Sequence, residues 1–491
     1  MNKFKKKSLY LAVAAGLGAV GLAGSAAAVN VNSNGLGQYL IYPYYTVRNG
    51  TDTYISLTNT SSFPKAVKVR FTEGKNSREV LDFNLYLSPY DMWTGALTAT
   101  ATGAMLITKD TSCTYPAIPA AGQAFVNYAY SGANPPAGGG FETSGGDGGD
   151  QSLDRTREGY FEIIEMGTIT DSAVAAAVLH SSGIPANCAY VQQPSGTMDM
   201  SPSGNHPLSA ASGGLEGNAT LINVAEGTDY GYDPVALDNF TSASYRPQGI
   251  WAPASTIYPN ATNADPNSTV FYNNVVVQTY WPSTGYRYGG VDAVSAVLMH
   301  DNVMNDYVLD AATLSGTDWV VTMPTKHWYV PIQEPSSNIS YSALQPFTTN
   351  FWNGACEKVD VSYWDREEQL IQNVSFSPPP PTQYNSLCWE STVVTFNDSN
   401  VLGSTNSVNI PVNFQDGWAK LSFDGAANIM QTPFTDTTIT PNGGTSYTAN
   451  ATYYGLPVVG FMVQDFVNGD VGGVLSNYGG NFNHKMTTKI Q

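Results

Sequence analysis

Hydrophobic side chains recur at every second position in the first part of the chain, and this period limits the fold more than any other feature of the sequence. Val67, Val69 and Phe71 alternate with Lys68 and Arg70. A period of two is typical of a β-strand that buries one face and exposes the other. The same period recurs over residues 81–87, and apolar strand-like runs return from residue 275 onward. The pattern predicts a mainly β fold in which these strands are half-buried.

Turn-forming residues are dense between the predicted strands. The chain contains 47 Gly and 29 Pro, which suits many short strands better than a helical bundle. We therefore expect immunoglobulin-like β-sandwiches with long loop insertions and a few short helices, although the Cys-Trp-Cys core pattern of immunoglobulin domains is missing. The best helix candidates are Asp171–His180 and Asp292–His300, which are rich in Ala and Val and carry Asp near the start.

Composition divides the chain into four expected regions. Residues 1–28 read as a signal peptide, and residues 29–110 as an N-terminal β-sandwich region. Residues 111–274 are rich in Gly, Pro, Ser and Asn and are expected to form an insertion region with a short helix. Residues 275–491 are expected to form a C-terminal β-rich region.

The N-terminus has the three parts of a secretory signal peptide. Four Lys precede an apolar stretch over residues 9–23, and the small residues Ala26, Ala27 and Ala28 follow. We expect cleavage after Ala28 and secretion to the extracellular space or the cell surface. A membrane anchor is the alternative, but the apolar stretch is short and interrupted by Gly. No later apolar run predicts a membrane-spanning segment in the mature chain.

The charge balance excludes one class of partner. Charged residues make up only 12% of the chain, against about 25% in an ordinary soluble domain. Removal of residues 1–28 takes away four Lys and no acids, so 17 basic and 39 acidic residues remain, with a formal net charge of −22. A nucleic-acid partner is therefore not expected, because phosphate binding depends on basic surfaces.

Four cysteines predict two disulfides in an exported chain: Cys113, Cys188, Cys356 and Cys388. Three pairings are possible. We favour Cys113 with Cys188 and Cys356 with Cys388, because these pairings keep each bridge local. Loops of this size would each add roughly 3–4.5 kcal/mol of stability in the chain-entropy model.

No catalytic residue is predicted. The mature chain contains no nucleophile elbow, zinc-protease motif, Walker loop or EF-hand loop. His180 and His300 end the two predicted helices, where a histidine more often stabilises the helix dipole than catalyses a reaction. The acidic residues around Trp364 could serve a glycosidase, but in residues 365–368 opposite charges are adjacent, which favours a self-paired turn.

A Gly-rich acidic segment is the one metal candidate. Residues 145–150 partly match the start of a calcium-binding repeat, with Asp147, Asp150 and Asp154 as oxygen ligands. The segment occurs once, and Ser152 stands where the repeat needs a large apolar residue. A solvated acidic loop is the alternative to a calcium site.

Tyr is abundant, with 30 residues, and two aromatic clusters could form a binding platform. They consist of Tyr42, Tyr44 and Tyr45, and of Trp328 and Tyr329. The alternative is that these rings pack in the core, because aromatic residues are favoured in strands generally.

The composition resembles surface-layer proteins as a class, since it is acidic, poor in Lys and rich in Thr, Ser, Asn, Ala and Gly. This resemblance implies an exported, non-catalytic cell-surface structural protein, surface-layer-like or adhesin-like. Its expected partners are other copies of itself or cell-envelope glycans. The alternative is a secreted carbohydrate-binding or carbohydrate-active protein.

Overall fold

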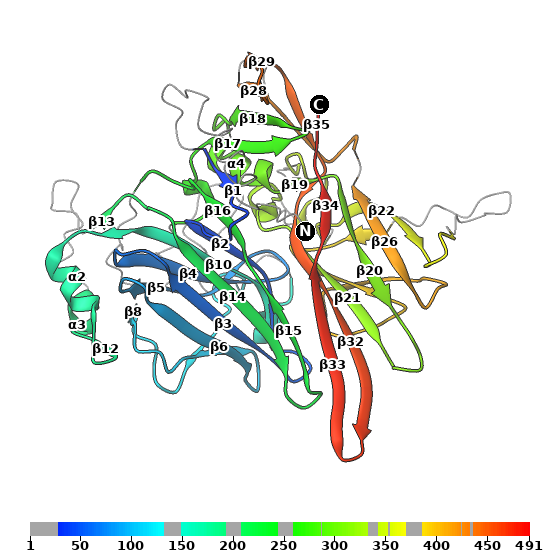
Figure 1. Ribbon diagram of the computed structural model, residues 1–491, viewed down its shortest axis with the longest axis horizontal. Coiled ribbons are helices and arrows are strands. Elements are labelled where there is room, and N and C mark those ends of the chain that lie inside the picture. The colour runs from blue at the N-terminus through cyan, green and yellow to red at the C-terminus, as the bar shows by residue number, and fades with distance from the viewer. Residues whose placement is uncertain are drawn as a thin grey trace, which may run out of the picture.

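The computed structural model describes residues 28–131, 149–192, 208–243, 259–285, 287–331, 342–351, 354–369, 385–423, 425–432 and 436–491. Strands dominate these residues and form several mainly antiparallel sheets, so the expected mainly β fold is confirmed (Figure 1). The strands form two large units, which we call the first unit (residues 28–243) and the second unit (residues 259–491). The first, blue to green, lies beside the second, which is green to red (Figure 1).

Two sheets face each other in the first unit. One has the order β1-β16-β2-β10-β4-β5-β8, and β13 pairs with β10. Its strands are β1 (Asn30–Val31), β2 (Tyr39–Thr46), β4 (Lys65–Glu73), β5 (Glu79–Leu87), β8 (Cys113–Tyr115), β10 (Glu158–Ile169), β13 (Leu208–Ser209) and β16 (Val235–Asp238). The other has the order β15-β14-β3-β6-β7-β9. Its strands are β3 (Thr51–Asn59), β6 (Met92–Ala99), β7 (Ala104–Ile107), β9 (Gln123–Ala124), β14 (Leu215–Asn223) and β15 (Thr228–Tyr232).

The period of two predicted strand β4 correctly, but it predicted the burial of only one of the two faces of the strand. Val67, Val69 and Phe71 fill the core between the two sheets, as the pattern indicates. The opposite face, which carries Lys68 and Arg70, is buried as well, so the expectation of a half-buried strand was wrong. The charged side chains can be buried because the neighbouring strands β5 and β10 supply acidic partners beside them. The buried ion pairs of β4 are Lys65–Glu165, Lys68–Asp82, Arg70–Glu79 and Arg70–Glu162.

The second unit also contains two large sheets, and each of them has five strands. One has the order β23-β22-β26-β20-β34, with β20 (Asn302–Val308), β22 (Glu357–Trp364), β23 (Asn385–Leu387), β26 (Asp416–Phe423) and β34 (Lys485–Thr487). The other has the order β25-β24-β21-β32-β33, with β21 (Gly316–Thr322), β24 (Ser391–Phe396), β25 (Ser407–Ile410), β32 (Val459–Val471) and β33 (Val474–Asn483). Strands β32 and β33 form a long hairpin that projects from the unit at the bottom of Figure 1. We call this hairpin the arm.

Four smaller sheets contain the other strands of the described residues. A four-stranded sheet at the top of Figure 1 has the order β17-β18-β28-β29. The strands are β17 (Asn267–Tyr272), β18 (Val275–Tyr280), β28 (Thr437–Pro441) and β29 (Tyr447–Thr448). The remaining sheets are β27-β30-β35, β19-β31 and β11-β12. Their strands are β27 (Ile429–Thr432), β30 (Ala451–Tyr454), β35 (Lys489–Ile490), β19 (Met299–His300), β31 (Leu456–Pro457), β11 (His180–Ser181) and β12 (Ile184–Pro185).

Both predicted helices are present. Helix α2 (Ser172–Val178) begins after Asp171, whose carboxylate accepts hydrogen bonds from the first free amides of the helix. Helix α4 (Gly289–Val297) begins earlier than expected, so Asp292 lies in its first turn. His180 and His300 lie in short strands after the helices. The other helical segments are α3 (Cys188–Val191), η1 (Leu153–Arg157), η3 (Ala261–Asn263) and η4 (Lys326–Trp328).

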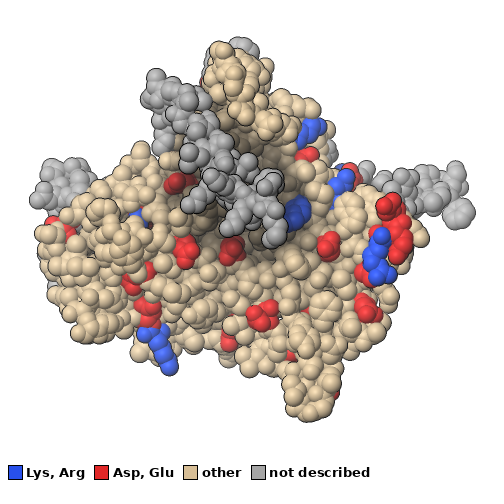
Figure 2. Space-filling model, viewed as in Figure 1, with Lys and Arg blue, Asp and Glu red and all other residues tan. Residues whose placement is uncertain are grey.

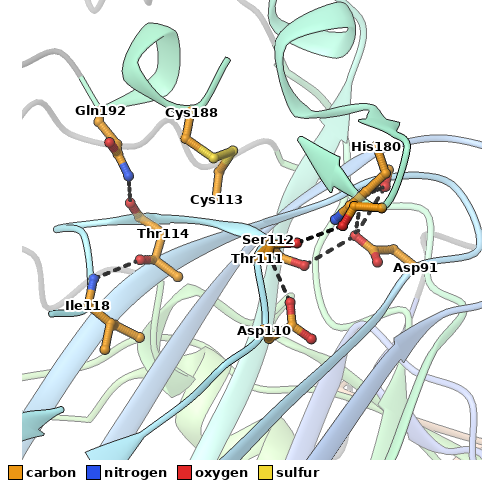
Figure 3. The surroundings of a disulfide bond; sticks show 12 residues. Asp91, Asp110, Thr111, Ser112, Cys113, Thr114, Ile118, His180, Cys188 and Gln192 are labelled. Carbon is orange, nitrogen blue, oxygen red and sulfur yellow. Dashed lines mark hydrogen bonds and ion pairs between the residues drawn. A yellow bond between two sulfur atoms is a disulfide. The ribbon is translucent and has the colours of Figure 1, made fainter. Parts of the chain in front are cut away.

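Two disulfides have the favoured pairing. Cys113 in β8 is joined to Cys188 in α3, and Cys356 is joined to Cys388. The first bridge ties the α2–α3 segment to the edge of the first large sheet (Figure 3), where the Gln192 amide also donates to the carbonyl oxygen of Thr114. Each disulfide lies within one unit, so other contacts connect the two units.

Candidate functional site

The sheet β23-β22-β26-β20-β34 buries one face and exposes the other. Ala419 and Leu421 of β26 pack inward with Val303 and Tyr307 of β20, and all four are buried. Because side chains alternate along a strand, the residues between them point outward. The outward set on β20, β22 and β26 is polar apart from two tryptophans, one methionine and one valine: Asn302, Met304, Asp306, Val308, Lys358, Asp360, Ser362, Trp364, Asp416, Trp418, Lys420 and Ser422.

Trp364 and Trp418 form the centre of this outer face. They are directly opposite each other in the β22–β26 register, and their indole rings are stacked with centroids 4.1 Å apart and planes 10° apart. Trp418 is 38% exposed, and Trp364 is half-buried. Each ring limits the movement of the other, so the exposed indole surface is held in place before a ligand arrives.

A glycine allows the two strands to meet here. A Cβ at Gly417 would lie 1.8 Å from the carbonyl oxygen of Trp364, so only Gly fits next to Trp418. The Tyr307 hydroxyl donates to the same carbonyl oxygen at 3.3 Å. The close approach of Gly417 and the hydrogen bond from Tyr307 therefore both fix the backbone at Trp364.

Charged side chains border the tryptophan pair. Asp306 is directly opposite Trp418 on β20 and is exposed. The guanidinium of Arg366, on the turn after β22, lies 3.0 Å from the carboxylate of Asp416, and 71% of its side chain is exposed. The predicted self-paired turn is thus present in part: Asp365 accepts amide hydrogen bonds from Glu367 and Gln369, while Arg366 pairs mainly with β26.

The other end of the outer face carries a connected set of hydroxyl and amide groups. The Asn302 amide donates to Asp301 and Thr487, and the Ser422 hydroxyl donates to the Asn302 oxygen at 2.6 Å. These groups fix one another in orientation. The outer face therefore offers a rigid aromatic surface together with oriented polar groups. This is the combination that a hydroxyl-rich ligand with apolar C–H faces requires.

The aromatic platform expected from the sequence is not on the surface. Tyr42, Tyr44, Tyr45 and Tyr329 are buried, and Trp328 is half-buried against Tyr288. This corrects the platform hypothesis. Strand β2, which carries the three clustered tyrosines, is covered on both faces, by the core of the first unit and by residues packed around α4. The signal for the real surface pair was the alternation of Trp418 with Ala419 and Leu421, but only the register shows that Trp364 is opposite.

The calcium candidates are divided in the structure. Asp147 lies outside the described residues. Asp150 accepts hydrogen bonds from the amide and hydroxyl of Ser152, and these bonds lower the pKa of its carboxyl. The Asp154 carboxylate lies 3.0 Å from Arg48 and 2.9 Å from Arg157. Within the described ranges, no group of three His, Cys, Asp or Glu side chains is placed to hold a metal ion. The calcium site stays a prediction.

His180 and Asp91 lie near the first disulfide (Figure 3), and Ser88 contacts both of them. The Ser88 hydroxyl lies 2.6 Å from Nδ1 of His180 and 3.1 Å from Asp91. Asp91 also approaches the same ring nitrogen, at 3.5 Å. A nucleophile–base–acid relay needs the serine and the aspartate on different ring nitrogens. The three residues therefore connect the β11 segment to the β5–β6 turn and do not have the geometry of a catalytic triad.

The comparisons with known proteins give no relative. The chain matches no protein-family model, and neither a curated protein nor a solved structure is similar to it. In the part of the chain that the structure describes, no helix is long and apolar enough to span a bilayer.

Proposed function

We propose that the chain is an exported, non-catalytic cell-surface protein of the adhesin-like kind, and that it binds polysaccharide on the outer face of the β22–β26–β20 sheet. The observation that carries the proposal is the stacked, partly exposed pair Trp364 and Trp418 on a solvent-facing polar sheet. An indole face packs against the C–H groups of a sugar ring, while Asp306 and Arg366 can exchange hydrogen bonds with its hydroxyls.

Export is part of this proposal and is supported by separate features. The signal-peptide pattern over residues 1–28 and two disulfides suit an oxidising compartment. The immunoglobulin-like arrangement of the strands also stays a prediction. It is consistent with facing sheets in both units and with the high strand content.

The charge distribution suits a neutral ligand. Figure 2 shows a face that is mostly uncharged, with acidic side chains more numerous than basic ones. The mature chain has a formal net charge of −22, so it would repel a strongly anionic polysaccharide. A neutral glycan with apolar ring faces avoids that repulsion and gains from the tryptophan pair.

The test is binding of the purified mature protein to a glycan array and to insoluble envelope polysaccharides. We expect Trp418→Ala to weaken binding about 30-fold, as is typical for a buried aromatic contact. Tyr447→Ala is the matched control, because Tyr447 is an exposed aromatic residue on β29, outside the outer face. Equal binding by both variants would contradict the proposal, and release of reducing sugars would contradict a non-catalytic role.

A further inference from the structure

The tip of the arm exposes aliphatic side chains. Val471 and Val474 flank the two-residue turn between β32 and β33 and are 60% and 65% exposed, and Leu475 is 49% exposed. Gly472 and Gly473 form the turn with positive φ angles of 67° and 86°, the combination that a tight two-residue hairpin requires. Single exposed aliphatic residues are common on protein surfaces, but a group of them at the end of a projecting hairpin indicates a contact surface.

The arm is braced, so its tip is presented in a fixed place. The Asn477 amide of β33 donates to the carbonyl oxygen of Glu226, on the turn between β14 and β15. Leu475 lies against Gly227 of the same turn. Val224, also on that turn, is 80% exposed. We call Val224, Val471, Val474 and Leu475 together the arm tip. Figure 2 shows the lower end of the molecule, where the arm projects, largely without charged side chains.

A largely apolar cavity of about 430 Å³ lies at the opposite end of the arm. Its volume falls within the range of about 300–1,000 Å³ that ligand pockets occupy. Val31, Val270, Leu298 and Val459 contribute to its walls, and Gly460 and Asn483, where the two arm strands begin and end, also line it. Exposed Phe271, at 65%, extends the apolar surface.

The cavity carries little charge. His300 and His484 are among the lining residues, and burial lowers the pKa of each to about 4, so both rings are neutral at neutral pH. His484 is also fully engaged, since Nε2 bonds to the carbonyl oxygen of Val320 and Nδ1 contacts the Asn305 amide. Asp233 is the charged lining residue and is exposed. An uncharged aliphatic group is therefore the occupant that the lining favours.

We propose that the arm tip of one copy of this protein inserts into the cavity of a second copy. Both surfaces are mainly aliphatic, with one exposed acid beside each, Asp470 at the turn and Asp233 at the cavity. They cannot meet within one molecule, because the arm begins at the cavity. From Gly460 to Val471 the strand rises by roughly 35–40 Å, at about 3.3 Å per residue. The contact is between two different surfaces, so a pair of copies still has one free tip, on one copy, and one free cavity, on the other.

A head-to-tail contact of this kind extends into a chain of copies unless its rotation closes a ring. The repeat along the chain would follow the length of the arm, roughly 35–40 Å. The buried area is small, so association is expected only at high concentration or on a crowded surface. The tryptophan face lies outside the contact, since neither Trp364 nor Trp418 lines the cavity. The inference therefore does not depend on the proposed function.

The first test is sedimentation velocity of the mature protein at concentrations up to about 200 µM. The wild type is expected to shift to larger species with concentration. The tip variant Val471→Asp/Val474→Asp is expected to stay monomeric. The matched control is Phe63→Asp/Tyr90→Asp, which adds the same charges at two exposed apolar residues of the first unit and is expected to associate like the wild type. A monomeric wild type at every concentration, or a tip variant that associates normally, would overturn the proposal.

The second test is complementation. Thr269→Trp fills the cavity from a half-buried strand position, so this cavity variant is also expected to stay monomeric. A mixture of the tip and cavity variants should form dimers and nothing larger, because only one intact tip and one intact cavity can pair. Circular dichroism checks that both variants are folded. Folded variants that form no dimer when mixed would overturn the head-to-tail contact, whatever the outcome of the glycan experiments.

Discussion

The carboxylate of Glu158, in β10 of the first unit, accepts hydrogen bonds from the amide and the hydroxyl of Thr405 in the second unit, at 3.0 and 2.6 Å. The Ser404 hydroxyl donates to the same carboxylate at 2.6 Å, and Arg48 pairs with it at 2.7 Å. Further contacts support the junction: the Thr322 hydroxyl donates to the carbonyl oxygen of Pro43, and Tyr232 stacks on Phe461. A single buried acid thus organises the junction between the units.

Replacing this acid should destabilise the protein strongly. Glu158→Ala takes from Arg48 one of its two acidic partners and leaves the Ser404 and Thr405 hydroxyls without this acceptor, and we expect the free energy of unfolding to fall by about 3–5 kcal/mol. Glu367→Ala is the matched control, because its side chain is 64% exposed, and we expect a change within about 0.5 kcal/mol. Urea denaturation of both variants measures the difference. Similar values for the two would show that Glu158 does not hold the units together.

The contribution of two buried carboxyls to the stability should fall as the pH rises from about 4 to 8. Burial raises the pKa of Asp318 to about 7 and that of Glu390 to about 8; Glu73 adds to the second shift, and Lys326 opposes it. Each native carboxyl keeps a proton that the unfolded chain loses above its ordinary pKa. The stabilisation is therefore complete below pH 4 and is lost as the pH passes the native values, by on the order of 2–4 kcal/mol for each group.

Glu390→Gln separates this effect from other titrations. The amide cannot ionise, so the loss of stability between pH 5 and 8 should become smaller than in the wild type. Denaturation midpoints measured across this range give the slope. If the stability of Glu390→Gln and of Asp318→Asn changes with pH as steeply as that of the wild type, these two carboxyls do not cause the pH effect.

A second pH effect has the opposite sign. Burial lowers the pKa of His484 to about 4, so the folded protein keeps the ring neutral while the unfolded chain binds a proton below about 6.5. Stability is therefore lost as the pH falls from about 6.5 to 4. We expect the midpoint temperature of unfolding of His484→Gln to fall less between about pH 6.5 and 4 than that of the wild type. A slope equal to that of the wild type would assign the acid sensitivity to other groups.

Removing the first disulfide should destabilise the first unit. Cys113 and Cys188 close a loop of 75 residues, and the chain-entropy model gives about 4 kcal/mol for a loop of this length. We expect Cys113→Ser/Cys188→Ser to lower the unfolding free energy by about that amount, with the mass difference of the missing bridge confirmed by mass spectrometry. Treatment of the wild type with a reductant opens both disulfides and should therefore give at least this loss. A variant as stable as the oxidised wild type would contradict the prediction.

The sequence predicted what depends on local pattern. The alternation around Val67 and Val69 correctly indicated a strand, and Asp171 marked the start of a helix because its carboxylate caps the nearest free amides. Local spacing also favoured the disulfide pairing that the structure contains. In the strand and the helix the interacting groups are close in sequence, or the pattern reports directly on one face of one strand. The disulfide pairing was favoured because four cysteines allow only three pairings and this one keeps the loops shorter.

The sequence could not predict what depends on distant pairing. Strand β10 lies between β2 and β4, and the tyrosines at 42, 44 and 45 are buried in a core that also contains Val320 and Phe461 of the second unit. The sequence around the tyrosines does not show that these distant residues pack against them. Likewise, Trp364 and Trp418 are 54 positions apart, and only the register of β22 and β26 stacks them. The candidate site was therefore visible as two separate aromatic residues but not as a surface.

The two disulfides join neighbouring cysteines in chain order, the first with the second and the third with the fourth. A polypeptide that leaves a secretion channel from its N-terminus exposes its thiols in the same order. An oxidase that joins each newly emerged thiol to the one before it would make both native bridges directly. If the chain is exported in this way, its folding would require no isomerase to reshuffle mispaired thiols, and the first bridge would form before the last cysteine emerges.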